Sequence, residues 1–199
     1  MVFSEPDPSE NGIPDVLHSV FADGPFKQCV ECGQELLESA TPHAVEKVVR
    51  EGEVIFEYAI CASCIITIFQ EYSEESLERI REYLEQEMSP LGDPGFIDQL
   101  LWSVGQPTED AIVQSREGKS LDTCHRCGQV DAFNSEHTVT GLLVGDRLAT
   151  EVSTICGACT EGLEELLSKQ TKDVHDDFIR RNFPGVPEGL DLPIGALGL

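Results

Sequence analysis

Eight cysteines carry the most specific chemical signal in this 199-residue chain. They fall into two sets of equal spacing, Cys-x2-Cys-x28-Cys-x2-Cys, and the second set begins 95 residues after the first. The candidate metal ligands are Cys29, Cys32, Cys61 and Cys64 in the first set and Cys124, Cys127, Cys156 and Cys159 in the second. A Cys-x-x-Cys pair places two sulfurs close enough to share one ion. The spacing therefore predicts two metal sites, each with four thiolate ligands.

The all-sulfur ligand set points to zinc. Four thiolates suit tetrahedral Zn²⁺, and four protein ligands leave no position for water or substrate. We therefore expect two structural zinc ions. A single iron in each site, as in rubredoxin, is the alternative, although Ile65 and Thr160 follow the second pairs where that site type favours glycine. Redox dithiols usually occur once, beside a βαβ pattern, and disulfides are rare in reducing compartments.

The eight cysteines can share ions within each set or across the two sets. Pairing within a set closes loops of 28 residues, whereas crossed pairing closes gaps of 91 residues. Loop entropy favours the shorter closure by only about 1 kcal/mol per site. The repetition of the whole pattern is the stronger argument, because it implies that one copy once made a complete site. We therefore expect pairing within each set.

The residues around the cysteines repeat as well. Cys32-Gly33-Gln34 matches Cys127-Gly128-Gln129, and Ile60-Cys61 matches Ile155-Cys156. Glycine after the second cysteine tolerates a positive φ, so the chain can turn back there and direct N–H groups at the sulfurs. We interpret the repeated pattern as an internal duplication.

Strand-forming residues lie between the two cysteine pairs of each set. Residues 44–50 and 54–60 are rich in β-branched and aromatic side chains, as are 138–144 and 147–155 in the second set. A glycine separates the two runs in both sets. These patterns predict one β-hairpin in each copy.

Helical periodicity follows each second cysteine pair, over 65–72 and 163–167. A further helix is expected in each copy. Ser73 can cap the first of these, whose apolar stripe runs through 77–84, and its counterpart covers 174–179. Each second pair thus lies where a helix begins, and the helix N-terminus favours thiolate.

In each copy a first Cys-x-x-Cys turn, called a knuckle below, is followed by a hairpin and then by a helix with the second pair. This order resembles the treble-clef group of zinc fingers. The resemblance covers about 29–72 and 124–168. It implies an α+β fold with two small zinc-binding modules, in which the eight cysteines bind zinc. It implies no activity, because that group serves many unrelated tasks. The chain departs from the group by lacking a proline inside the first knuckles and by its scarcity of basic residues.

Modules of this size bury little apolar surface, so we expect each to depend on its metal. Two extra short helices are predicted, over 14–22 and 93–105, the second carrying Trp102. The expected organisation, in chain order, is a disordered N-terminus (1–12), a first zinc module (13–90), a helix and linker (91–121), a second zinc module (122–182) and an extended C-terminal tail (183–199).

The chain is strongly acidic, with 37 Asp and Glu against 13 Lys and Arg and a formal charge of −24. The acidic residues are spread along its whole length, and the pair Arg180-Arg181 follows Asp176 and Asp177. Nucleic-acid-binding proteins neutralise phosphates with clustered cations, so this class is disfavoured. A well-solvated surface explains the charge without a partner, and a surface that binds a basic protein explains it with one.

Other sequence signals narrow the functional class. No stretch reaches the roughly 18 uninterrupted apolar residues of a membrane span, and residues 1–12 do not resemble a signal peptide. We expect a cytoplasmic protein without a membrane partner. The histidines are scattered, and His125, inside a knuckle, is expected to be a solvent-facing loop residue. The histidines are His18, His43, His125, His137 and His175.

No catalytic constellation is recognisable, so we expect a protein without enzymatic activity. The leading hypothesis is a zinc-stabilised, acidic module that binds a protein partner. One alternative is a redox or metal-handling protein with Fe(Cys)4 centres. The other is a nucleic-acid-binding zinc finger protein, which the charge disfavours.

Overall fold

The computed structural model describes residues 12–38, 40–87, 121–129, 136–149 and 152–185. Most of the predicted disordered N-terminus (1–12), of the helix and linker (91–121) and of the extended C-terminal tail (183–199) lies outside the described residues. No helix in the described ranges is both long and apolar enough to cross a membrane.

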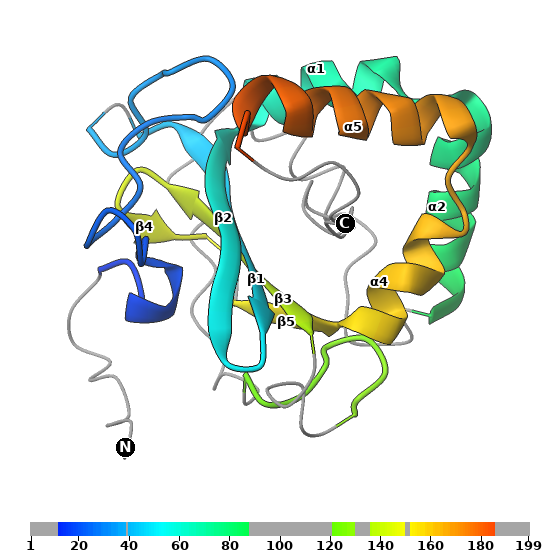
Figure 1. Ribbon diagram of the computed structural model, residues 1–199, viewed down its shortest axis with the longest axis horizontal. Coiled ribbons are helices and arrows are strands. Elements are labelled where there is room, and N and C mark those ends of the chain that lie inside the picture. Colours follow the sequence, from blue (N-terminus) through cyan, green and yellow to red (C-terminus); the bar gives the residue numbers. More distant parts are fainter. Residues whose placement is uncertain (1–11, 39, 88–120, 130–135, 150–151, 186–199) are drawn as a thin grey trace.

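The fold is α+β, with one antiparallel sheet of five strands (Figure 1). The strands are β1 (Pro42–Arg50), β2 (Glu53–Cys61), β3 (His137–Val144), β4 (Arg147–Leu148) and β5 (Ser153–Cys156). The helices are η1 (Asp15–Leu17), α1 (Ala62–Glu71), α2 (Glu74–Glu87), α4 (Gly157–Glu164) and α5 (Lys169–Asn182). The sheet order is β2-β1-β3-β4, and β5 also pairs with β3.

The first predicted hairpin is present as β1 and β2. Its turn uses Glu51 and Gly52, whose φ angles are 53° and 80°. Positive φ at both central residues is the geometry that matches the twist of two-residue hairpins. The hairpin extends slightly beyond the prediction at both ends.

The second hairpin differs from the prediction in its returning strand. Residues 147–155 do not form one strand, because β4 and β5 are separate. Leu148 pairs with Leu143, and Ser153 pairs with Thr140. Between these pairs β3 has two residues and the opposite chain has four. The returning chain is therefore two residues longer than β3 over this interval, which does not fit one regular ladder.

The two halves of the chain share this sheet. β3 pairs antiparallel with β1 along its whole length, from Pro42 opposite Val144 to Val49 opposite His137. Buried side chains from both halves also form one hydrophobic core, which includes Phe178 from the second half. The cysteine sets therefore lie at separate places on a common scaffold.

Different elements pack on the two faces of the sheet. Leu17 of η1 is fully buried and lies against Gly141, which is opposite Val45 in the sheet. On the other face, the ring of Tyr58 contacts the ring of Phe178 in α5, with centroids 5.6 Å apart. α5 also contacts α1, so a helix from the second half covers elements of the first.

The helix expected over 14–22 is wrong beyond its first turn. Only η1 is helical, and Ser19 and Gly24 then form an isolated antiparallel bridge. The physical reason lies in β2, where the Glu57 carboxylate accepts the N–H groups of Val20 and Phe21. These N–H groups are therefore not available for helical hydrogen bonds.

Candidate metal centres

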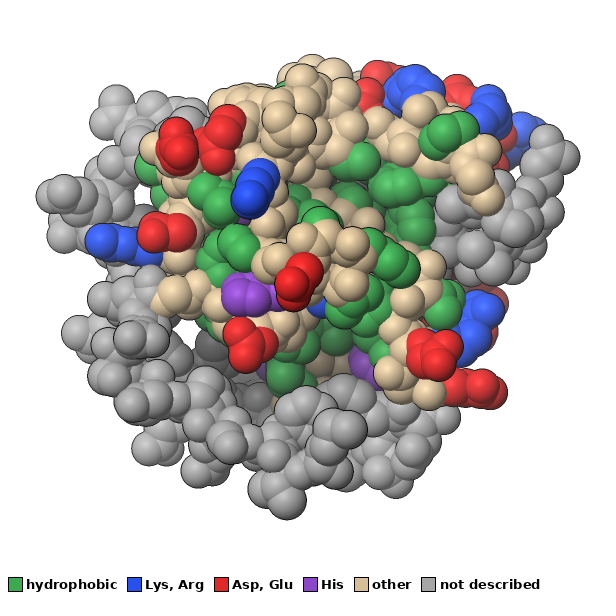
Figure 2. Space-filling model, turned by 60° about the vertical axis from the view of Figure 1, so that its left-hand side comes forward, with side chains coloured by type: hydrophobic (Ala, Val, Ile, Leu, Met, Phe, Trp, Pro, Cys, Tyr) green, Lys and Arg blue, Asp and Glu red, His purple; other side chains and the backbone are tan. Residues whose placement is uncertain are grey.

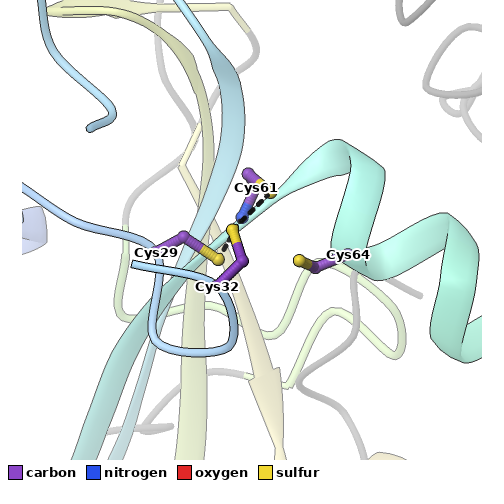
Figure 3. A group of neighbouring side chains, drawn as sticks. All are labelled: Cys29, Cys32, Cys61 and Cys64. Carbon is purple, nitrogen blue, oxygen red and sulfur yellow. Dashed lines mark hydrogen bonds between the residues drawn. The ribbon is translucent and has the colours of Figure 1, made fainter. Parts of the chain in front are cut away.

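The eight cysteines gather into two groups, each from one set. Site 1 contains Cys29, Cys32, Cys61 and Cys64, and site 2 contains Cys124, Cys127, Cys156 and Cys159. Within each group, all four sulfurs lie within 4.8 Å of one another. In site 1, two sulfurs come from the loop before β1, one from the end of β2 and one from the first turn of α1 (Figure 3). Either group could hold a metal ion.

The first pair of each site lies in a tight knuckle. In site 1, the Cys29 N–H donates to the Gln34 carbonyl over 2.8 Å, and the Gly33 N–H donates to the Cys29 carbonyl over 2.9 Å. Gly33 has a φ of 71°, in the region that favours glycine. The same two hydrogen bonds occur in site 2, where Gly128 has a φ of 70°. The predicted role of these glycines in the turn is confirmed.

The second pair of each site lies at a helix start. Cys61 is the N-cap of α1 and Cys156 is the N-cap of α4, with φ and ψ of −72° and 151° against −74° and 155°. Their N–H groups donate to the sulfurs of Cys29 and Cys124 over 3.3 and 3.4 Å. Both sites thus direct a backbone dipole at a first-pair sulfur, which stabilises its thiolate.

Burial differs among the ligand candidates in the same way at both sites. Two cysteines of each group are buried, one is half-buried and one is exposed. The exposed residues are Cys32 and Cys127, the second cysteine of each knuckle. Each site therefore lies at the edge of the core, with one side reachable from solvent.

The thiols differ in pKa before any cation binds. Burial raises the pKa of Cys61 to about 11 and raises the pKa of Cys64 as well. Burial also acts on Cys124, but backbone N–H groups, among them those of Cys127 and Cys156, outweigh it and lower its pKa to about 7. Four thiolates in one group repel one another. A divalent cation removes this repulsion, which is why metal binding and thiol deprotonation are coupled.

The residue just before the second knuckle cysteine differs in charge between the two sites. In site 2, Arg126 lies near the sulfurs, and its guanidinium donates to the Cys159 carbonyl over 2.9 Å. In site 1, the corresponding residue is Glu31, which accepts hydrogen bonds from Arg181 and Asn182 of α5. Neither residue is among the site residues predicted from the sequence, although both lie inside the Cys-x-x-Cys pairs, which is the signal that could have identified them.

His125 is not the solvent-facing residue that the sequence suggested. It is half-buried, and its Nδ1 accepts a hydrogen bond from the Thr154 N–H over 3.1 Å. It ties the knuckle of site 2 to β5 and belongs to neither group of metal-ligand candidates. Both sites also share a backbone contact at this place, since the Val30 N–H donates to the Ala59 carbonyl over 2.9 Å and the His125 N–H donates to the Thr154 carbonyl over 2.8 Å. The His125 side chain adds a second hydrogen bond at site 2.

Comparison with protein-family models, curated proteins and solved structures finds no match.

Proposed function

We propose that this chain is a non-enzymatic, cytoplasmic interaction module that holds two structural zinc ions and binds a protein partner through its acidic surface. The observation that carries the proposal is the pair of four-cysteine groups, each with its sulfurs within 4.8 Å of one another. Site 1 and site 2 would each bind one Zn²⁺. Zinc supplies a tetrahedral crosslink between a knuckle and the start of a helix.

The chemistry of the donors supports a structural role for the metal. Four sulfurs complete a tetrahedral shell, so no ligand position is left for water or substrate. Within each site the ligands come from a loop, a strand end and a helix, as in treble-clef zinc fingers. Cys64 and Cys159 lie in the first turns of helices without a following glycine turn, which favours zinc over a rubredoxin-like iron.

Matched contacts support an origin of the two halves by duplication. The knuckle hydrogen bonds, the positive-φ glycines and the helix-capping cysteines recur at a constant offset. Sulfur contacts recur as well, since Cys32–Cys61 and Cys127–Cys156 are both 3.8 Å apart. Such agreement in backbone detail is expected when both halves descend from one module.

The charge distribution supports a protein partner over a nucleic acid. Many basic side chains in the described residues form ion pairs with carboxylates, as in Arg50–Glu136, Arg79–Glu75, Lys169–Asp173, Arg180–Asp177 and Arg181–Glu31. These ion pairs leave fewer cations for phosphates in the described part of the chain, whereas the excess of carboxylates remains. An acidic surface of this kind attracts a basic protein and repels a nucleic-acid backbone.

Metal analysis of protein purified without added zinc tests the proposal. We expect close to two zinc ions per chain, one after Cys61→Ser, and two in the control Ser63→Ala, which changes an exposed residue of the same helix turn. Fewer than two zinc ions in the unaltered chain, or oxidised cysteine pairs, contradict the assignment. Visible absorption with bound iron favours the Fe(Cys)4 alternative instead.

A second measurement tests the partner class. Titration with duplex DNA and with RNA at physiological salt should show no binding. Micromolar binding that weakens as salt increases would support the nucleic-acid alternative.

A further inference from the structure

The segment 19–24 presents two apolar side chains to solvent. Val20 is 56% exposed and Phe21 is 73% exposed, and they are the exposed large hydrophobic residues of the described chain. Ser19 and Gly24 close the segment through hydrogen bonds in both directions, of 2.7 and 3.5 Å. Single exposed apolar residues are common, so exposure needs a second observation before it indicates function.

That observation is the way the backbone of this segment is held. The Glu57 carboxylate of β2 accepts hydrogen bonds from the Ser19 hydroxyl (2.5 Å), the Val20 N–H (3.2 Å) and the Phe21 N–H (3.3 Å). The Ala22 N–H donates in turn to the Ser19 hydroxyl over 2.9 Å. The two exposed side chains therefore project from a backbone whose N–H groups are already bound.

The carboxylate that holds the segment is itself part of a buried ion pair. Lys47 lies 3.5 Å from Glu57, and their side chains are only 4% and 2% exposed. The Lys47 ammonium also donates to the His18 carbonyl. Burying two charges is costly unless further hydrogen bonds satisfy them, and here the 18–21 backbone supplies those bonds. Sheet and segment stabilise each other in one arrangement.

This arrangement lowers the cost of binding through Phe21. An exposed aromatic side chain adds large apolar contact area, and such residues dominate binding energy when a partner buries them. A backbone that is ordered before binding loses little further entropy. The structure thus keeps Phe21 in place before a partner arrives.

The surrounding charge indicates the chemistry of the partner. Residues 12–24 contain Asp15 and Asp23 and no Lys or Arg. The Asp15 side chain is fully exposed. Figure 2 brings this side of the molecule forward and shows acidic and apolar side chains interspersed. A second copy of a chain with a charge of −24 would repel this surface, as would an anionic membrane.

We infer that Phe21, with Val20 beside it, anchors a protein partner that offers an apolar pocket bordered by Lys and Arg. The inference rests on the proposed interaction function and assigns it to this surface. Phe21 fills the pocket, and Asp15 and Asp23 face the basic border.

Residue-specific photo-crosslinking followed by titration tests the inference. Full-length protein with p-benzoylphenylalanine at position 21 is irradiated in extract of the native cell, and protein with the same group at position 169 is the control. Lys169 is well exposed and is the first residue of α5. Figure 1 shows α5 away from the segment 19–24. We expect an adduct with one protein species from position 21 and none from position 169. The crosslinked peptide should contain apolar residues next to Lys or Arg.

The captured protein is then purified and titrated against the unaltered chain, Phe21→Ala and Asp15→Lys. Phe21→Ala should raise Kd about tenfold or more, and Asp15→Lys should raise it at low salt. Added salt should weaken binding of the unaltered chain. Metal analysis should find two zinc ions in both variants, because both positions are exposed.

Several outcomes overturn the inference. An adduct with a second copy or with lipid identifies a different occupant, and an unchanged Kd for Phe21→Ala removes the anchor. Adducts from position 169 alone leave the proposed interaction function intact but move it to another surface. The absence of adducts from both positions contradicts the inference and the protein-binding function together, whatever the zinc content.

Discussion

The hydroxyl oxygens of Ser73 and Ser168 lie 2.8 Å apart, although the residues are 95 positions apart in the chain. The Ser73 N–H donates to the Thr171 hydroxyl over 3.1 Å, and the Ser168 N–H donates to the Ser76 hydroxyl over 2.8 Å. Ser76 and Thr171 are fully buried, and their hydroxyls lie 3.0 Å apart. Each half of the chain therefore completes the helix cap of the other, at the same offset that relates the two cysteine sets.

The first prediction concerns these hydrogen bonds between the two helix caps. Ser168→Ala should lower the free energy of unfolding by about 1–2 kcal/mol, because it removes the cap of α5 and leaves the Ser73 hydroxyl with one partner fewer. Ser73→Ala should act similarly. The double variant should cost less than the sum of the two, as measured by urea unfolding of zinc-loaded protein. Thr67→Ala, on an exposed helix face, is the control and should change stability by under about 0.5 kcal/mol. Additive effects would contradict the coupling.

The second prediction concerns how far the loss of zinc from site 1 reduces hydrogen-exchange protection in the rest of the fold. Cys61→Ser should release one zinc ion and leave the other. The ligand loss should reduce hydrogen-exchange protection of β2 and α1, and also of α5, because Phe178 packs on Tyr58. A module that depended only on its own half would lose protection over 44–72 alone. Retained protection of α5 after loss of the first zinc would therefore contradict a shared core.

The matched variant Cys156→Ser tests the same point from the second half. It should release the ion of site 2 and loosen β5, which pairs with β3. Because β3 also pairs with β1, β1 should lose some protection as well. Loss of both ions from either variant would show that the two sites bind metal as one cooperative unit.

The third prediction concerns Glu46, in the centre of the sheet. It is 1% exposed, and among the described residues neither carboxylate oxygen has a hydrogen-bond partner. Burial raises the pKa of Glu46 well above its ordinary value of 4.5. The folded state then binds this proton more tightly than the unfolded state does. Its contribution to stability is full below pH 4.5 and is lost as the pH rises toward the folded-state pKa.

Glu46→Gln should therefore be more stable than the unaltered chain at high pH, and its stability should depend less on pH. Urea unfolding of zinc-loaded protein between about pH 6 and 9 measures both effects. Glu53→Gln, at the exposed start of β2, is the control and should keep the pH dependence of the unaltered chain. An equal decline of stability with pH in Glu46→Gln would assign the dependence to other groups.

The fourth prediction distinguishes the structural roles of two glycines. In Gly33→Ala the new Cβ meets no atom of the described residues within 4 Å, but the residue must adopt a φ of 71°. The variant should therefore cost about 1 kcal/mol and weaken zinc binding at site 1. Gly141→Ala has no such φ, but its Cβ would collide with the buried side chain of Leu17. It should cost about 1–3 kcal/mol through overpacking.

The two glycine variants should also differ in their readouts. Gly141→Ala should keep both zinc ions and loosen the segment 12–24 in hydrogen exchange. Competition with a zinc chelator measures the first variant, and hydrogen exchange measures the second. Zinc loss from Gly141→Ala, or loosening of 12–24 by Gly33→Ala, would contradict these assignments.

The sequence by itself determined the local features of this protein. The cysteine spacing identified two groups of four, glycine after each knuckle indicated the turn, and Ser73 indicated a helix start. The turn and the helix start depend on interactions between residues a few positions apart, such as the Ser76 N–H that donates to the Ser73 hydroxyl over 3.2 Å. The cysteine groups follow from the repeated spacing of a residue type that binds metal. The types of neighbouring side chains are therefore enough to predict them.

Only the tertiary structure decided how the halves combine. The pairing of β1 with β3, the Ser73–Ser168 contact and the hydrogen bond from the Phe21 N–H to the Glu57 carboxylate all join residues at least 36 positions apart. Strand and helix patterns state which residues prefer burial but do not specify which buried surface covers which. The segment 14–22 shows this limit, because its helical pattern was overridden by a carboxylate that folding brings from β2. Long-range hydrogen bonds of this kind leave no periodic signal in the sequence.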